Sequence, residues 1–179
     1  MKKQAAFRIM RDAAFLRKGE KRMRVLVISD SHRRRPTLEA VEMVCQGPNA
    51  PDLVVHLGDH IGDARWLRER IKQPIIAVPG NCDWSDEPAE RVENLGGADV
   101  LMMHGHTRGV KMSLMSLACL AQEKGVRAAL FGHTHAPYMA YEYGVLLLNP
   151  GALQDEKCAL LEIEKGEIRG RRLNINKIC

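Results

Sequence analysis

Short apolar runs alternate with helical patterns through the middle of the chain. Residues 24–29 (RVLVIS) form an almost unbroken β-branched run. Such a run is typical of a strand that is buried on both faces of a parallel sheet. Patterns of this kind predict strands at 24–29, 53–57, 75–78, 99–103 and 128–131, and helices at 36–46, 63–72 and 111–124.

The last third of the chain has a different pattern. Apolar stretches at 138–142, 145–148, 158–164 and 167–175 are separated by short turns at Gly144 and at Lys165-Gly166, which predicts antiparallel hairpins. Strands that alternate with helices and then pair in hairpins indicate an α/β protein with mixed sheets flanked by helices. The length of 179 residues fits one such domain.

The first 22 residues differ from the rest in charge. They hold eight Lys or Arg and two Asp or Glu, a net charge of +6, whereas the whole chain carries +5, so residues 23–179 carry −1. We expect a domain at 23–179 preceded by a basic extension at 1–22, with a short amphipathic helix at 5–16. This extension is either a partner-binding segment or an appendage from a start codon upstream of Met23. The near-neutral domain does not favour nucleic acid as a partner.

Composition and cysteine spacing bear on the compartment. With 45% hydrophobic and 27% charged residues the chain has the composition of a globular protein, and no apolar run reaches the ~20 residues of a membrane span. The five cysteines contain no C-x-x-C pair, which excludes a zinc ribbon and does not suggest a disulfide framework. We therefore expect a cytoplasmic protein.

Five of the predicted strands are each followed by side chains that bind metals. The carboxyl ends of parallel strands meet at one edge of a sheet, so these side chains are expected to converge. Imidazole and carboxylate groups together are typical ligands of divalent transition metals. The segments concerned are Asp30-Ser31-His32, Gly58-Asp59-His60, Gly80-Asn81-Cys82-Asp83, His104-Gly105-His106 and Gly132-His133-Thr134-His135.

The order of these motifs, D-x-H, G-D, G-N, H-G-H and G-H-x-H between residue 23 and about residue 151, resembles the calcineurin-like metallophosphoesterase superfamily. The size resembles its small single-domain bacterial and archaeal phosphodiesterases. The resemblance implies a two-layer β sandwich flanked by helices, with a binuclear metal site at the strand ends. It implies that Asp59 bridges two ions, one bound by Asp30, His32 and His135 and the other by Asn81, His104 and His133.

The same resemblance implies an activity. Two divalent ions, Mn²⁺ by resemblance, with Ni²⁺, Zn²⁺, Fe²⁺ or Mg²⁺ as alternatives, would hold a bridging hydroxide that attacks a small phosphodiester. The competing hypothesis is a non-catalytic protein-binding module, because a subunit of the eukaryotic retromer has a similar scaffold. All seven ligand positions hold competent side chains, which favours catalysis. The sequence leaves a homo-oligomer open.

Further residues are candidates for contacts with the substrate. Much of the superfamily has histidine where this chain has Cys82, and an ordinary thiol, of pKa ~8.5, is a poor proton donor to a leaving group near pH 7. The other candidates are Asp59, His106 and Asp83 in catalysis, and Arg33, His60 and Cys82 in substrate binding, although His60 and His106 also fit solvent-facing turns and Arg33–Arg35 fit a solvated turn. Asp63 is expected to be the N-cap of the helix that follows the second strand.

Overall fold

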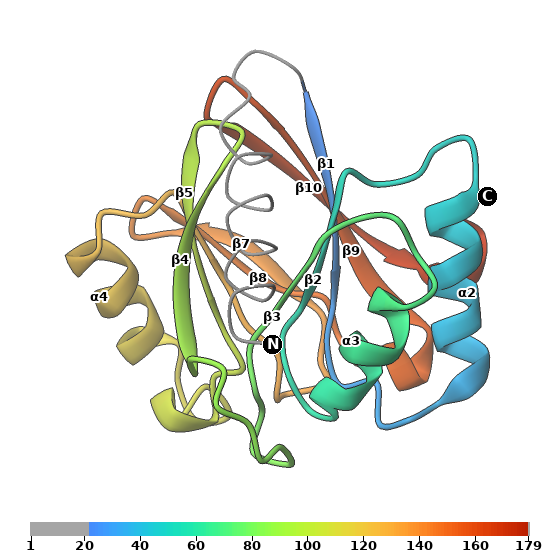
Figure 1. The fold of residues 1–179 in the computed structure, drawn as a ribbon. Helices are drawn as coiled ribbons and strands as arrows, with labels where there is room; N and C mark the ends of the chain where they lie inside the picture. Colours follow the sequence, from blue (N-terminus) through green and yellow to red (C-terminus); the bar gives the residue numbers. More distant parts are fainter. Residues whose placement is uncertain (1–21, 179) are drawn as a thin grey trace, which may run out of the picture.

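A computed structural model describes residues 22–178 and shows two five-stranded sheets packed face to face. Helices α2 and α3 cover the outer face of one sheet, and α4 covers the outer face of the other (Figure 1). The predicted α/β/β/α sandwich is therefore confirmed. The extension expected at 1–22, including its helix at 5–16, lies outside the described residues except for Arg22.

The first sheet has the strand order β10-β9-β1-β2-β3. Its centre is parallel, with β1 beside β2 and β2 beside β3, and β9 joins it antiparallel to β1. The final hairpin, β9 with β10, is also antiparallel, as predicted. The strands are β1 (Met23–Ile28), β2 (Leu53–His56), β3 (Ile75–Ala77), β9 (Lys157–Glu164) and β10 (Glu167–Asn174).

The second sheet has the order β4-β5-β6-β8-β7, with parallel β5, β6 and β8 between antiparallel edge strands. Edge strand β4 was not predicted. Its sequence, ERVENL, is mostly polar because only its last residue is buried, so it lacks the apolar pattern of the other strands. The strands are β4 (Glu90–Leu95), β5 (Ala98–Met103), β6 (Ala128–Leu130), β7 (Tyr138–Glu142) and β8 (Val145–Asn149).

Both faces of the central strands are buried, which explains their unbroken apolar sequences. In β1, Val25 and Val27 belong to the core between the two sheets, whereas Leu26 and Ile28 pack in the layer under α2 and α3. A third apolar cluster joins α4 to β5, β6 and β8. The helices are α2 (Arg35–Gln46), α3 (Ile61–Arg68) and α4 (Met115–Glu123), with 3₁₀ turns η1 (His106–Arg108), η2 (Leu153–Asp155) and η3 (Ile175–Lys177).

Two helices differ in extent from the prediction. The helix expected at 63–72 is α3, which begins two residues earlier and ends at Arg68. The helix expected at 111–124 begins only at Met115, because the chain first forms a turn in which the N–H groups of Met112 and Ser113 donate to Gly109 O. Within residues 22–178, none of the helices is long and apolar enough to cross a membrane.

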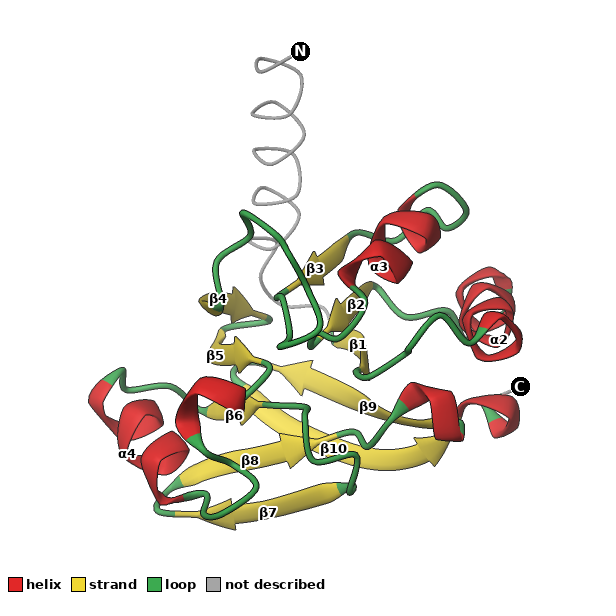
Figure 2. Cartoon of the chain, turned by 90° about the horizontal axis from the view of Figure 1, so that it is seen from below, coloured by secondary structure: helices red, strands yellow, loops and turns green. Residues whose placement is uncertain are grey.

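The loops that follow β1, β2, β3, β5 and β6 gather at one edge of the sandwich. Figure 2 views the molecule from this edge, so that these loops lie in front of the two sheets. Hydrogen bonds between the loops confirm their proximity: Asp30 N–H donates to Gly58 O, and Gly132 N–H donates to His104 O, each at 3.0 Å. Both sheets therefore contribute to this edge.

Candidate metal centre

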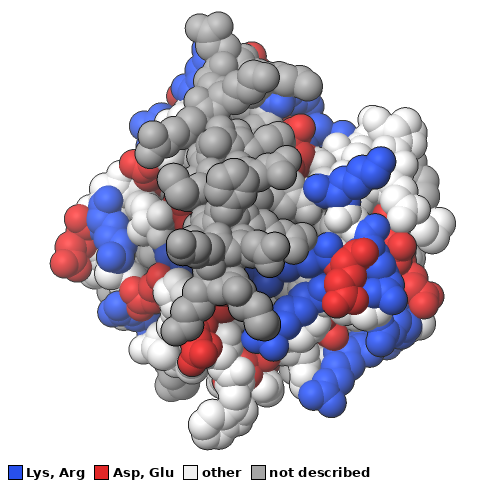
Figure 3. Space-filling view, in the orientation of Figure 1, with Lys and Arg blue, Asp and Glu red and all other residues white. Residues whose placement is uncertain are grey.

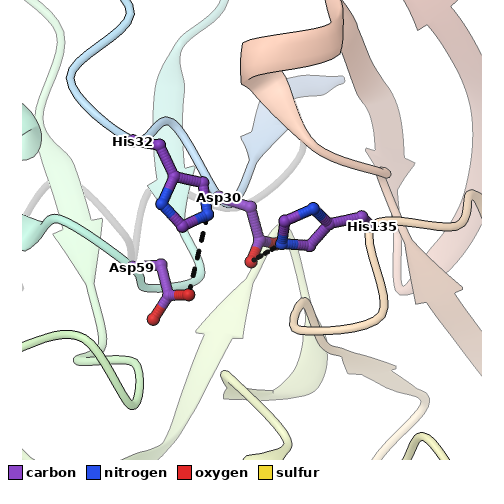
Figure 4. A group of neighbouring side chains, drawn as sticks. All are labelled: Asp30, His32, Asp59 and His135. Atoms are coloured by element: carbon purple, nitrogen blue, oxygen red, sulfur yellow. Dashed lines mark ion pairs between the residues drawn. The ribbon is translucent and has the colours of Figure 1, made fainter.

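Four side chains from this edge form a compact cluster of metal-binding type. Asp30 and His32 follow β1, Asp59 follows β2 and His135 follows β6, and one ligand atom of each lies within 4.8 Å of those of the others. Figure 4 shows the four side chains pointing toward one another. Both carboxylates are buried, whereas the two imidazoles are partly exposed. The cluster thus opens to solvent on its histidine side.

The facing atoms of this cluster fit a divalent cation. His135 Nε2 lies 3.1 Å from Asp30 Oδ1, and His32 Nε2 lies 3.8 Å from Asp59 Oδ2. Within the described residues, Asp30 Oδ1 and His32 Nε2 are buried without a hydrogen bond of acceptable geometry. Buried polar atoms are normally paired with a hydrogen-bond partner. Two unpaired atoms that point into the same cluster therefore indicate that a ligand binds there. Two carboxylates and two imidazoles suit Mn²⁺, Fe²⁺ or Zn²⁺.

A second set of donors lies beside the first. The Nδ1–H of His104 donates to Leu57 O at 2.7 Å, which leaves a lone pair on Nε2 when the ring is neutral. This Nε2 faces two further acceptors, Asn81 Oδ1 at 3.2 Å and Asp59 Oδ1 at 3.4 Å. Three acceptors with no proton between them favour a cation. The ring centroid of His133 is 5.0 Å from that of His104.

Asp59 lies between the two sets. Its Oδ2 points toward His32, while its Oδ1 points toward His104 and accepts the Cys82 N–H at 3.0 Å. Burial by itself raises the pKa of this carboxyl, but the Cys82 N–H and the His104 ring outweigh burial and leave the pKa below its usual value. Asp59 is therefore ionised at neutral pH.

The histidines near the second set are held neutral. Burial lowers the pKa of both His106 and His133, and the neighbouring His104 adds to the effect. A neutral imidazole is the form that binds a metal. The ring of His106 lies 5.4 Å from that of His104 and 6.1 Å from that of His133, and its buried Nδ1 has no hydrogen-bond partner among residues 22–178.

The backbone of these loops is unusual. The left-handed region is uncommon for residues other than glycine, and it persists only where surrounding contacts enforce it. The glycines beside these residues are needed for close approach, since a Cβ at Gly58 would lie 2.7 Å from Gly80 N. The left-handed residues, with φ between 45° and 67°, are Asp30, His32, Arg33, Asp59, His60, His133 and His135.

Two further carboxylates hold the loops. Asp83 accepts hydrogen bonds from Ile61 N–H at 2.7 Å and from Gly80 N–H at 2.8 Å, so it closes the N-terminus of α3 and fixes the loop before Asn81. The prediction that Asp63 is the N-cap of α3 is wrong. The N-cap residue is His60, and Asp63 points instead to the loop after β1.

The predicted substrate contacts lie around the cluster. The ring of His60 stands edge-on to that of His32, with centroids 5.1 Å apart. Arg33 is exposed and follows His32 in the loop after β1. Cys82 is exposed, and its Sγ lies 3.4 Å from Asn81 Nδ2. Burial and the nearby Asp59 carboxylate raise the pKa of its thiol. Cys82 is therefore a neutral thiol at pH 7.

Some residues that shape the site were missed in the sequence. Gln154 lies with its Nε2 3.4 Å from His135 Nδ1. Buried Asn149 donates to Gly132 O at 2.7 Å and so holds the loop that carries His133. Asn149 is a polar residue at the end of an apolar strand, which is the signal that pointed to the predicted ligands, whereas Gln154 lies in turn η2 and carries no such signal. Both residues lie outside the histidine motifs in the sequence, so neither was singled out from the sequence.

Comparisons with known proteins agree with this geometry. Residues 23–166 match the model of the calcineurin-like phosphoesterase superfamily domain. The chain is 32% identical over 149 residues to the probable metallophosphoesterase YsnB of Bacillus subtilis, a match that covers 79% of this chain and 85% of that protein.

Solved structures share the fold. A predicted phosphoesterase from Streptococcus pneumoniae is 28% identical, with a TM-score of 0.71 over 87% of this chain and 91% of that one. A novel archaeal phosphodiesterase (21% identical, TM-score 0.68, 84% and 100% covered) and the zinc complex of Vps29 from Entamoeba histolytica (21%, 0.64, 86% and 100%) are more distant. The similarity to these last two concerns the fold alone.

Proposed function

Since the chain belongs to the calcineurin-like phosphoesterase superfamily, we propose that it is a metal-dependent phosphodiesterase that hydrolyses a small phosphodiester. The observation that carries this proposal is the position of Asp59, whose two carboxylate oxygens face two different sets of nitrogen and oxygen donors. A solved archaeal protein of the same fold is described as a phosphodiesterase, and we carry the diester over from it as part of this proposal.

We assign the donors to two ions. Asp30, His32 and His135 would hold one ion, Asn81, His104 and His133 the other, and Asp59 both. When bound, two such ions, Mn²⁺ by preference, supply a water nucleophile at neutral pH and offset the charge of the phosphoryl oxygens. The ionised Asp59 lowers the repulsion between the two cations.

The chain's own side chains orient the substrate. Arg33, exposed and next to His32 in the chain, and the His60 ring, which contacts the His32 ring, would donate hydrogen bonds to a phosphate oxygen on this side of the cluster. His106 borders the other side and offers an N–H from its neutral ring. Asp83 acts as a positioning residue, because its two oxygens accept the N–H groups of Ile61 and Gly80 and so hold the loops that carry the donors.

The state of Cys82 affects the leaving group. Its thiol has a raised pKa and so donates a proton poorly at pH 7. The leaving alkoxide then departs with little assistance, so the rate should fall steeply as the pKa of the leaving alcohol rises. A series of aryl and alkyl diesters tests this, and a flat dependence would contradict it.

Metal reconstitution tests the function directly. The metal-stripped protein is loaded in turn with Mn²⁺, Ni²⁺, Zn²⁺ or Mg²⁺ and assayed on an aryl phosphodiester, a phosphomonoester and cyclic nucleotides. We expect diester hydrolysis with at least one ion and its loss in Asp59→Asn. Asp52→Asn is the matched control, because Asp52 also accepts a backbone N–H, from Arg24 at 2.8 Å, far from the cluster.

The similarity in fold to Vps29 leaves a second function possible for this chain, that of a non-catalytic protein-binding module. The complete donor set favours catalysis over this alternative, because a scaffold used only for binding does not need seven competent ligands. Inactivity of the reconstituted protein with every ion would favour the binding module.

A further inference from the structure

Behind the metal cluster, three buried polar side chains from three different elements form a chain of hydrogen bonds. Ser31 follows β1, His56 ends β2 and Asp63 lies in α3, with exposed fractions of 0%, 0% and 8%. Ser31 Oγ lies 3.0 Å from His56 Nε2 and 2.7 Å from Asp63 Oδ2. Burying polar groups costs free energy unless they are paired, so this chain has to be complete to be tolerated.

The direction of every proton in the chain is determined. Gly58 N–H can only donate, and it donates to His56 Nδ1 at 3.2 Å, so the proton of the neutral ring is on Nε2. His56 Nε2–H then donates to Ser31 Oγ, and the Ser31 hydroxyl donates to the Asp63 carboxylate at 2.7 Å, a much shorter contact than the 3.4 Å to its other acceptor, Asp59 O. Burial lowers the pKa of His56 to about 4, so the ring keeps this neutral form at pH 7.

This chain of hydrogen bonds fixes the neighbours of two metal ligands. Asp63 Oδ2 also accepts the N–H of Arg33 at 2.9 Å, so the residues on both sides of His32 are tied to α3. Gly58, bound to His56, directly precedes Asp59. His32 and Arg33 have φ of 45° and 59°, a conformation that external contacts have to enforce. In Figure 4, the His32 and Asp59 side chains that depend on these loops face one another.

We propose that Asp63, Ser31 and His56 are positioning residues that hold the His32 and Asp59 loops in the geometry that binds the metal. In this role they contact neither substrate nor metal. They raise the affinity for the metal by holding the backbone of the two loops. The proposal rests on the metal binding assigned under the proposed function. Asp63 is the central member, because one carboxylate oxygen serves both Ser31 and Arg33.

Metal affinity of the apo protein measures this role. Titration calorimetry with Mn²⁺ is carried out on wild type, Asp63→Ala, Asp63→Asn and Ser31→Ala. We expect Asp63→Ala to weaken binding by about 10–100-fold, the usual effect of removing a group that orients a ligand. Asp63→Asn should bind within about threefold of wild type, because its single amide oxygen can replace Oδ2. Ser31→Ala should lie between these two.

A matched control separates positioning from general stability. Asp52→Ala removes a carboxylate that accepts a backbone N–H at the opposite end of β1. It should lower stability and leave Mn²⁺ affinity unchanged. Circular dichroism establishes which variants fold. Equal affinity of wild type and Asp63→Ala, or equal losses in Asp63→Ala and Asp52→Ala, would overturn this proposal alone, whereas absence of Mn²⁺ binding by wild type would overturn the proposed function together with it.

A spectroscopic measurement needs no metal. Nitrogen-15 NMR of the apo wild type should show His56 as the neutral tautomer with its proton on Nε2. The amide of Arg33 should be protected from hydrogen exchange in wild type and in Asp63→Asn and lose that protection in Asp63→Ala. The opposite tautomer, or an unchanged exchange rate in Asp63→Ala, would contradict the hydrogen-bond directions on which the proposal stands.

Discussion

At the residue scale, Gly80 shows how little room the cluster leaves. A Cβ at this position would collide with the Asp59 carboxylate and backbone. We expect Gly80→Ala to lower kcat/KM by about 100-fold, the effect of displacing a catalytic group by about 1 Å. Overpacking should also cost about 1–3 kcal/mol of stability. Steady-state kinetics and urea unfolding measure the two effects.

Gly62 is the matched control for this substitution. It lies in α3, and a Cβ there would meet nothing within 4 Å. Gly62→Ala should stabilise the protein by about 0.4–1 kcal/mol, because alanine restricts the unfolded chain. Its kcat/KM should equal that of wild type. Similar kinetic losses in both variants would contradict the steric argument.

His56 predicts a pH dependence of stability. Its pKa is about 4 in the folded protein and about 6.5 in an unfolded chain, so the unfolded state binds more protons between these values. Stability is therefore lost as pH falls from 6.5 toward 4, by about 3 kcal/mol for this group. Urea unfolding with EDTA present should show a smaller pH dependence in His56→Gln. Parallel curves for both proteins would contradict the assignment.

The sequence reveals the candidate ligands better than the groups that hold their loops. His32 and Asp59 stand directly after apolar strands, and the topology of parallel strands brings such residues together. Asp63 was misassigned as an N-cap, because its partners, Ser31 and Arg33, are some 30 residues away in the sequence. Local patterns carry no information about contacts of that range.

At the element scale, α3 organises the edge that carries the site. Its N-terminus is closed by Asp83 from the loop after β3, and its Asp63 reaches the loop after β1. A helix of only eight residues is marginal alone, so tertiary contacts have to stabilise it. The helix and the loops therefore depend on one another.

Removal of the Asp83 carboxylate tests this dependence. Asp83→Ala leaves Ile61 N–H and Gly80 N–H without their acceptor, and we expect a loss of about 2–3 kcal/mol in urea unfolding. Asp83→Asn keeps one oxygen and should lose about half as much. A full loss of activity in Asp83→Ala with unchanged stability would instead indicate that this carboxylate contacts the substrate.

Elements with two buried faces were predictable, and of the four edge strands in the described part of the chain only β4 was missed. Strand β1 was found within one residue because all its positions except Arg24 face an apolar layer. Strand β4 was missed because it has a partner only on one side and keeps polar, half-exposed residues. The start of α4 was misplaced because residues 111 and 112 belong to a turn in which Met112 N–H donates to Gly109 O, and apolar spacing alone does not reveal this turn.

At the scale of the whole molecule, the distribution of charge bears on the size of a partner. On the face shown in Figure 3, positive and negative side chains lie intermingled outside the grey region. The described part of this face therefore offers no uniform positive surface to a long polyanion.

Metal binding should stabilise the whole fold. The cluster takes Asp30 from the first sheet and His135 from the loop after β6 in the second. A ligand that binds only the folded state at 100 times its Kd adds about 2.7 kcal/mol, or roughly 5–10 °C in Tm for a domain of this size. Calorimetric scans with Mn²⁺ and with EDTA measure the shift. Asp59→Asn should show little of it, and an equal shift in that variant would contradict the site.

The origin of the ligands in both sheets also has a kinetic consequence. The candidate ligands are spread from Asp30 to His135 and come from loops of both sheets, so we expect them to meet late in folding, once the sheets have packed. Interactions that are absent from the transition state for folding lower the unfolding rate and leave the folding rate unchanged. A bound ion would then link the two sheets, so that it prolongs the lifetime of the folded protein without changing how fast the protein folds.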